Sequence, residues 1–165
     1  MRDKKVLLIT QAAMIAALYV VLTLLANALG LANYAVQVRF SEALTVLPFF
    51  TPAAIPGLTA GCILSNLLTG CMPLDIVFGS LATLLGAVGT YLLRKHMWAA
   101  PLPPIAANTL IVPFILAYVY QFEGSIPYFM LTVGIGEIIS CGILGMILMG
   151  ALNKYKNVIF AKKAV

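Results

Sequence analysis

Long apolar runs separated by short polar or proline-containing breaks dominate the chain. A run of about 20 apolar residues is long enough to cross the hydrocarbon core of a bilayer as an α-helix. The breaks predict six helical spans, at about residues 6–29, 41–50, 52–68, 74–93, 100–120 and 127–152. A basic leader (1–5) precedes them and a basic tail (153–165) follows. We therefore predict an all-α membrane protein, a six-transmembrane-helix bundle that forms a single integral membrane domain over residues 1–165.

The stretch over 41–68 is interrupted by three prolines and could form one span or two. Cytoplasmic loops carry an excess of Lys and Arg. With two spans, both termini face the cytoplasm, and nine of the ten basic residues lie inside with only Arg39 outside. A single span would leave three inside and seven outside. We expect six spans with cytoplasmic termini, and residues 41–50 are too short to cross the bilayer as a straight rod.

Composition excludes several classes of protein. Hydrophobic residues make up 62% of the chain and charged residues 9%, against about 25% charged in soluble domains. The basic residues are scattered between apolar runs and form no face for nucleic acid. One histidine, His96, and three cysteines without a CxxC pair predict no metal site and no cofactor. No P-loop motif occurs, so we expect no ATP hydrolysis by this chain and no enzyme activity.

The first apolar run follows a basic leader, as the apolar core of a signal peptide does, but it is longer. It extends over Val6–Leu29, which is 24 residues, whereas the apolar core of a signal peptide has about 7–15. We therefore interpret it as a retained first span.

The acidic residues are distributed unevenly in the predicted topology. Asp3 is cytoplasmic, whereas Glu42, Asp75, Glu123 and Glu137 fall in the outer half or in the membrane. Glu137 lies about ten residues, or roughly 15 Å, into its span. A carboxylate at that depth costs on the order of 2.5–3.5 kcal/mol, so it should face protein or a wet cavity. It shares a helix face with Gly134, Ser140 and Cys141, which favours a pocket lining over a protonated interhelical contact.

Five further polar residues are candidate ligand contacts, each with a structural alternative. Asp75 begins a helix, where an acid is favoured by the macrodipole, and it could also line a pocket. Asn66 and Asn108 are amides within apolar spans that either bond neighbouring helices or contact a ligand. Arg39 and Glu42 are three residues apart. They could form an ion pair with each other, or either side chain could cover a bound ligand.

Small residues recur at four-residue spacing in two of the spans. Ala12 and Ala16, and Ala13 and Ala17, form overlapping pairs in the first span, and Gly57 and Gly61 form another in the third. Such faces allow close helix packing. They serve either internal contacts or docking of another membrane subunit.

Three segments carry a specific resemblance to a known family. These are residues 38–50 (VRFSEALTVLPFF), residues 56–67 (PGLTAGCILSNL) and residues 74–85 (LDIVFGSLATLL). They resemble the QueT family, whose members are substrate-binding S components of energy-coupling factor (ECF) transporters for queuosine precursors. The alanine pairs are similar to the AxxxA face by which S components meet the transmembrane coupling subunit.

The resemblance implies a partner set and a ligand class. The chain would bind a small molecule at its outer side, associate with one coupling subunit and two ATPase subunits, and topple to release the ligand inside. A 7-deazaguanine presents two parallel donors that a carboxylate can accept, and an aminomethyl substituent adds a cation for a second acid. Glu137 and Asp75 suit these roles in either order, with Asn66 or Asn108 for the amide edges. Tyr34 and Phe40 remain for stacking.

Other functions compete with this interpretation. The chain could be an S component for another vitamin-like solute, or a self-sufficient secondary transporter with Glu137 as the proton-coupled acid. Many such carriers contain internal repeats, which this chain lacks. An intramembrane enzyme would need a nucleophile–base pair, and the one histidine lies at the predicted cytoplasmic boundary.

Overall fold

The computed structural model describes residues 2–31 and 38–159, all of whose regular elements are helical. The α-helices are α1 (Arg2–Ala28), α2 (Ala54–Leu68), α3 (Pro73–Leu92), α4 (Leu102–Tyr118), α5 (Ile126–Glu137) and α6 (Gly145–Ile159). Two 3₁₀-helices, η1 (Phe40–Phe49) and η2 (Met97–Ala99), and one π-helix, η3 (Ile138–Leu144), complete the fold. The prediction of an all-α protein is confirmed.

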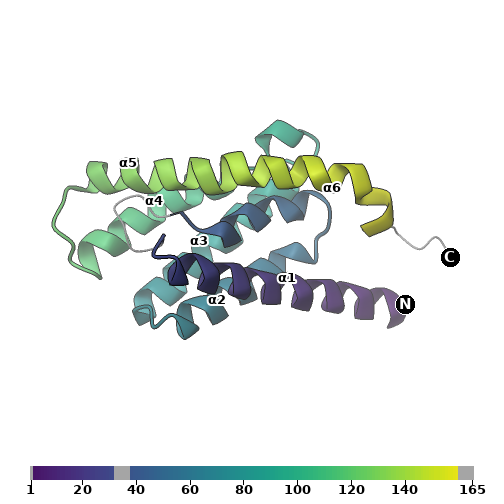
Figure 1. Ribbon diagram of the computed structural model, residues 1–165, viewed down its shortest axis with the longest axis horizontal. Coiled ribbons are helices and arrows are strands. Elements are labelled where there is room, and N and C mark those ends of the chain that lie inside the picture. Colours follow the sequence, from purple (N-terminus) through teal and green to yellow (C-terminus); the bar gives the residue numbers. More distant parts are fainter. Residues whose placement is uncertain (1, 32–37, 160–165) are drawn as a thin grey trace.

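Within residues 2–31 and 38–159, four helical segments are long and apolar enough to cross a membrane. They cover Lys4–Ala28, Pro73–Leu92, Met97–Tyr118 and Ile126–Lys156. In the last of these, α5, η3 and α6 follow one another without a break and form one long rod (Figure 1). The remaining two apolar helices, η1 and α2, have 10 and 15 residues. The helices thus fall where the apolar runs predict them, and the protein is a helical membrane protein.

The two ends of the bundle differ in the chain segments they carry. Helix α1 begins and α6 ends at the same end, which we call the terminal end (Figure 1). The α2–α3 turn and the α4–α5 connection lie at the opposite, distal end. Because α3 runs away from the distal end, the α3–α4 connection with Arg94 and Lys95 belongs to the terminal end.

Large apolar side chains cover the outside of the bundle, and many polar side chains are buried inside it. Large apolar residues of α1, such as Ile9, Met14 and Val21, are more than half exposed. The buried polar residues include Thr23, Glu42, Asn66, Asp75, Thr83, Thr90, Asn108, Glu137 and Ser140. Since lipid solvates apolar side chains well and polar ones poorly, this distribution fits a protein surrounded by bilayer.

The short helix η1 lies in the centre of the bundle. It packs against α1, α2, α3, α6 and η3, and Leu44 and Leu47 enter a core cluster with Tyr19 and Leu58. A 3₁₀-helix rises about 2 Å per residue, so its 10 residues span roughly 20 Å. This is less than the hydrocarbon thickness of about 30 Å, which agrees with the expectation that this segment is no straight spanning rod.

Two glycines bring α1 and α2 into close contact. A Cβ added at Gly57 would lie 2.7 Å from the Ala12 carbonyl oxygen, and one at Gly61 would lie 3.1 Å from the Ala16 Cα. Ala16 is buried at this contact, whereas Ala13 and Ala17 are exposed. The two predicted alanine pairs therefore occupy different environments: one packs against the chain's own α2, and the other faces outward.

Candidate ligand-binding site

A cavity of about 760 Å³ is lined by residues at the distal end of the bundle. Ligand sites commonly measure 300–1,000 Å³, so it can hold a bicyclic heterocycle with a substituent. Its aromatic lining comes from the α4–α5 region and consists of Tyr120, Phe122, Tyr128 and Phe129. Its polar lining includes Thr23, Asn27, Arg39, Asn66, Asp75, Glu123 and Thr132.

Asp75 and Asn66 meet at the wall that α2 and α3 contribute to this cavity. Asp75 lies in the first turn of α3, after Pro73 at the helix start. A Cβ added at Gly79 would be 3.2 Å from Asp75 Oδ1 and 3.4 Å from Asn66 Nδ2, so both side chains approach the helix backbone at this glycine. The helix-start and pocket-lining interpretations of Asp75 are therefore compatible.

Tyr120 connects the two distal segments through Asp75. Its hydroxyl donates to Asp75 Oδ2 at 2.8 Å and accepts from the Met72 N–H at 3.2 Å. Burial, followed by the hydrogen bond to the Asp75 carboxylate, raises the pKa of Tyr120 above its ordinary value. The phenol therefore stays a neutral donor to Asp75 at physiological pH.

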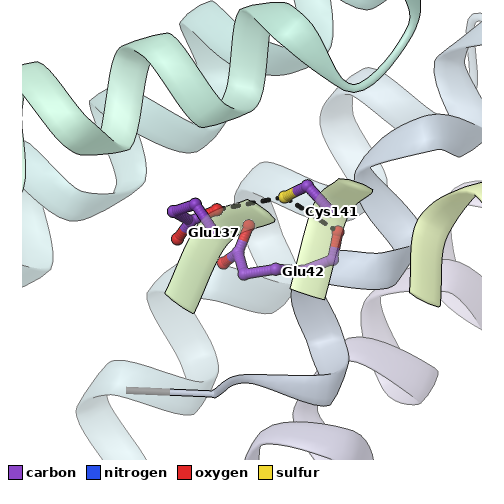
Figure 2. Close-up of side chains that lie close together, drawn as sticks. All are labelled: Glu42, Glu137 and Cys141. Carbon is purple, nitrogen blue, oxygen red and sulfur yellow. Dashed lines mark hydrogen bonds between the residues drawn. The ribbon is translucent and has the colours of Figure 1, made fainter. Parts of the chain in front are cut away.

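A second polar group, which we call the inner cluster, consists of Glu42, Glu137 and Cys141. Their potential ligand atoms lie within 4.8 Å of one another, and all three side chains are buried. Figure 2 shows the side chains converging from η1 and from the α5–η3 segment. The Cys141 thiol donates to Glu137 Oε2 at 3.0 Å, and its contact with the Glu42 carbonyl oxygen is 3.5 Å.

Local structure positions the inner cluster. Glu137 is the last residue of α5, and the π-helix η3 begins directly after it. π-Helical turns occur frequently at functional sites. On the other side, the first turn of η1 is held by two hydrogen bonds, from Thr23 to the Ser41 hydroxyl at 2.8 Å and from the Arg39 N–H to the Ser140 hydroxyl at 3.1 Å.

The inner cluster has more hydrogen-bond acceptors than donors. Glu42 Oε1 accepts from the Tyr19 hydroxyl at 2.5 Å. The Asn108 amide approaches both carboxyl groups, yet Glu42 Oε2 is buried and accepts no hydrogen bond from the described residues. Two carboxylates this close repel each other unless a proton or a cationic group lies between them.

The structure divides the six predicted site residues into two groups. Arg39, Asn66 and Asp75 line the distal cavity, whereas Glu42, Asn108 and Glu137 are buried together. Arg39 interacts electrostatically with both Glu42 and Asp75. Arg39 therefore interacts with an acid of each group.

Several site residues were missed by the sequence interpretation. Tyr19, Thr23 and Asn27 of α1 contact the inner cluster or the cavity. Their four-residue spacing in the otherwise apolar part of α1 after Gln11 was a usable signal. Of the two residues expected to stack on a ligand, Tyr34 lies outside the described residues and Phe40 begins η1. The aromatic lining instead comes from the α4–α5 region.

An apolar groove of about 470 Å³ lies between the first half of α1 and the start of α2. It is lined by Leu8, Ile9, Ala12, Ala13, Ala16, Pro52, Ala53, Pro56, Gly57 and Ala60. Ala12, Ala13 and Ala16 of the predicted docking face belong to this groove, and Ala17 is exposed one turn beyond Ala13.

An apolar helical bundle with a polar cavity at one end defines a membrane protein that binds a small solute. The family profile described as QueT transporter matches residues 9–154, and the chain belongs to this family. It is also similar to the queuosine precursor transporter QueT of Lactococcus lactis subsp. cremoris (strain MG1363). The two are 29% identical over 165 residues, covering 93% of this chain and 96% of the relative. No solved structure matches. The resemblance seen in the sequence is confirmed, and the chain is a transport protein.

Proposed function

We propose that this protein is the substrate-binding S component of an ECF importer. It binds a queuosine precursor, a 7-deazaguanine or queuine, at the outer side of the cell membrane and releases it inside. ATP hydrolysis by two ATPase subunits, acting through a transmembrane coupling subunit, drives the release. The observation that carries this proposal is the acid-lined distal cavity in a chain of the QueT family.

Charge distribution supports an orientation with the cavity outside. Lys4, Lys5, Lys154 and Lys156 lie on the helix segments of the terminal end, together with Arg94 and Lys95. Arg39 is at the distal side. By the positive-inside rule, the terminal end is cytoplasmic, which is consistent with six spans.

Thiol labelling in intact cells tests this orientation. In a background without the native cysteines, we expect a membrane-impermeant maleimide to label Met72→Cys in the distal turn, where Met72 is 47% exposed. Lys156→Cys in α6 should react only after permeabilisation. Labelling of Lys156→Cys in intact cells would refute cytoplasmic termini.

The chemistry of the cavity supports the ligand class. A flat bicyclic base can stack on the aromatic wall, and its N1–H and 2-amino donors match a carboxylate acceptor. Acids near the cavity outnumber the one cation, Arg39, among the described lining residues. This excess suits a donor-rich or cationic base better than an anionic vitamin.

A self-sufficient proton-coupled transporter is the second candidate. The proximity of Glu42 and Glu137 favours it, because a carboxyl pair can bind and release a proton.

Reconstitution distinguishes the two functions. Purified protein alone in liposomes should bind a 7-deazaguanine but not accumulate it. Adding the coupling subunit and both ATPases, with ATP on their side, should start uptake. Accumulation by the protein alone, driven by a pH gradient, would refute the S-component assignment.

A further inference from the structure

The α3–α4 connection, residues 93–101, is an ordered turn at the terminal end that carries an exposed tryptophan. The Ala100 N–H donates to the Met97 carbonyl oxygen at 3.2 Å, and the Thr90 hydroxyl donates to the Ala100 carbonyl oxygen at 2.8 Å. Trp98, the only tryptophan of the chain, is 82% exposed. The connection thus combines a fixed backbone with a large aromatic ring that the protein itself does not cover.

Local geometry directs Trp98 outward. Met97 and Ala100 lie on either side of it in sequence, and both pack into a core cluster with Val46 and Met149. In a 3₁₀-helix, side chains three residues apart lie on the same face. Because this face of η2 is directed at the core, the side chain between them points away from it. The exposure of Trp98 therefore follows from the packing of its neighbours.

Trp98 lies at the edge of two membrane spans. Helix α3 ends at Leu92, and the next candidate span begins at Met97. Trp98 is therefore within about one helical turn of the hydrocarbon edge. Tryptophan favours this level of a bilayer, because its ring is apolar and its indole N–H can bond to headgroups. The membrane interface is thus the environment that fits this side chain.

The same connection carries two cations, Arg94 and Lys95, and residues 93–101 include no acid. Both cations are exposed. The Arg94 guanidinium lies 4.2 Å from the centroid of the Tyr91 ring, which holds it at the end of α3. Stacking uses the face of the guanidinium, so the N–H groups at its edge remain available to a phosphate. A pair of cations beside an interfacial ring matches the headgroup of an anionic lipid.

We propose that the α3–α4 connection binds the headgroup of an anionic phospholipid. Trp98 inserts beside the glycerol region of this lipid, and Arg94 and Lys95 bind its phosphate. The site is separate from the ligand cavity, which is lined by residues at the distal end. Lipid binding here is therefore independent of the solute that the cavity holds.

Fluorescence quenching in vesicles tests this site, because all tryptophan emission of the chain comes from Trp98. The protein is reconstituted in equal parts of phosphatidylcholine and phosphatidylglycerol, with the acyl chains of either one or the other brominated as quencher. We expect phosphatidylglycerol to be preferred beside Trp98 by about 5- to 30-fold, the factors that one and two basic residues give at a membrane surface. Higher salt should reduce this preference but not the total quenching, because salt screens charge and leaves the ring buried.

Two double variants separate a site from general charge. Arg94→Gln with Lys95→Gln should make quenching by the two lipids equal. Lys4→Gln with Lys5→Gln removes the same charge from exposed positions of α1, which packs against α2 and η1. This control should keep the preference of the wild type.

Four results would overturn the proposal. Absence of quenching by either lipid would place Trp98 outside the bilayer. Equal quenching by both lipids in the wild type, which requires no variant, would leave no anionic site. An equal loss of preference in both double variants would indicate a general charge effect. Equal quenching in the wild type, combined with loss of the coupling subunit on purification of the Arg94 and Lys95 variant, would make this face a protein-docking surface.

Discussion

Replacing Ala13 and Ala17 together by tryptophan is expected to abolish uptake and co-purification with the ATPase module, while ligand affinity stays near that of the wild type. Both alanines are exposed, and Ala13 lines the apolar groove between α1 and α2. Helices in lipid associate mainly by close packing. A bulky side chain at the groove would hold a partner helix away and lose many contacts of about 0.1–0.2 kcal/mol each. The cavity is too distant to be affected, since Ala13 is roughly 20 Å along α1 from Asn27.

Two variants on the same helix serve as controls. Ala12→Trp with Ala16→Trp should damage the fold and lower ligand binding, because these residues contact Gly57 and Gly61 of α2. Met14→Trp, at a position that is 61% exposed and outside the groove lining, should leave uptake intact. Binding and co-purification are measured on the same preparation. Normal ATP-dependent uptake by the Ala13 and Ala17 double variant would contradict docking at this face.

Glu137→Gln is expected to weaken ligand binding by about 10- to 150-fold, the equivalent of 1.5–3 kcal/mol for a hydrogen bond to a charged group. The substitution also removes one of two neighbouring buried acids. The empty protein should therefore be as stable as the wild type or more stable, because the repulsion with Glu42 is gone. Affinity then falls without a loss of stability, which a purely structural role for Glu137 does not produce.

Thermal unfolding with and without ligand measures both quantities at once. The melting temperature of the empty variant should stay level or rise, and its increase on adding ligand should shrink, because that increase depends on affinity. Glu123→Gln provides a matched substitution at an exposed acid of the cavity, where water screens the charge and the loss should be much smaller. A Glu137→Gln variant with wild-type affinity would contradict ligand contact.

The helix positions could be predicted because they follow from local sequence. Apolar runs and proline breaks mark the helices, and the cost of a charge in lipid correctly places Glu137 inside the protein. The proximity of Glu42 and Glu137 was not predictable in this way, because it brings together η1 and the α5–η3 segment, which is far along the chain. The π-helical turn beside Glu137 likewise has no signature in the hydrophobic pattern.

The environments of the two alanine pairs could not be predicted from the sequence either. They are offset by one residue, or about 100° around the helix, so each pair was equally suited to face α2 or the lipid. Only the position of Gly57 and Gly61 in space determines that Ala12 and Ala16 are the internal pair. Sequence spacing thus identified both faces but not their environments.

The continuous rod of α5, η3 and α6 makes bilayer thickness relevant to this protein. Its candidate membrane segment has 31 residues, ends with Lys154 and Lys156, and is roughly 46 Å long, against about 30 Å of hydrocarbon. Fitting this length by tilt alone would require close to 50°, beyond the usual range of about 0–40°. Part of the rod must therefore extend into the headgroup region or the lipid must thicken around it. Because Glu137 lies within this rod, the depth of this buried acid depends on the membrane that surrounds the protein.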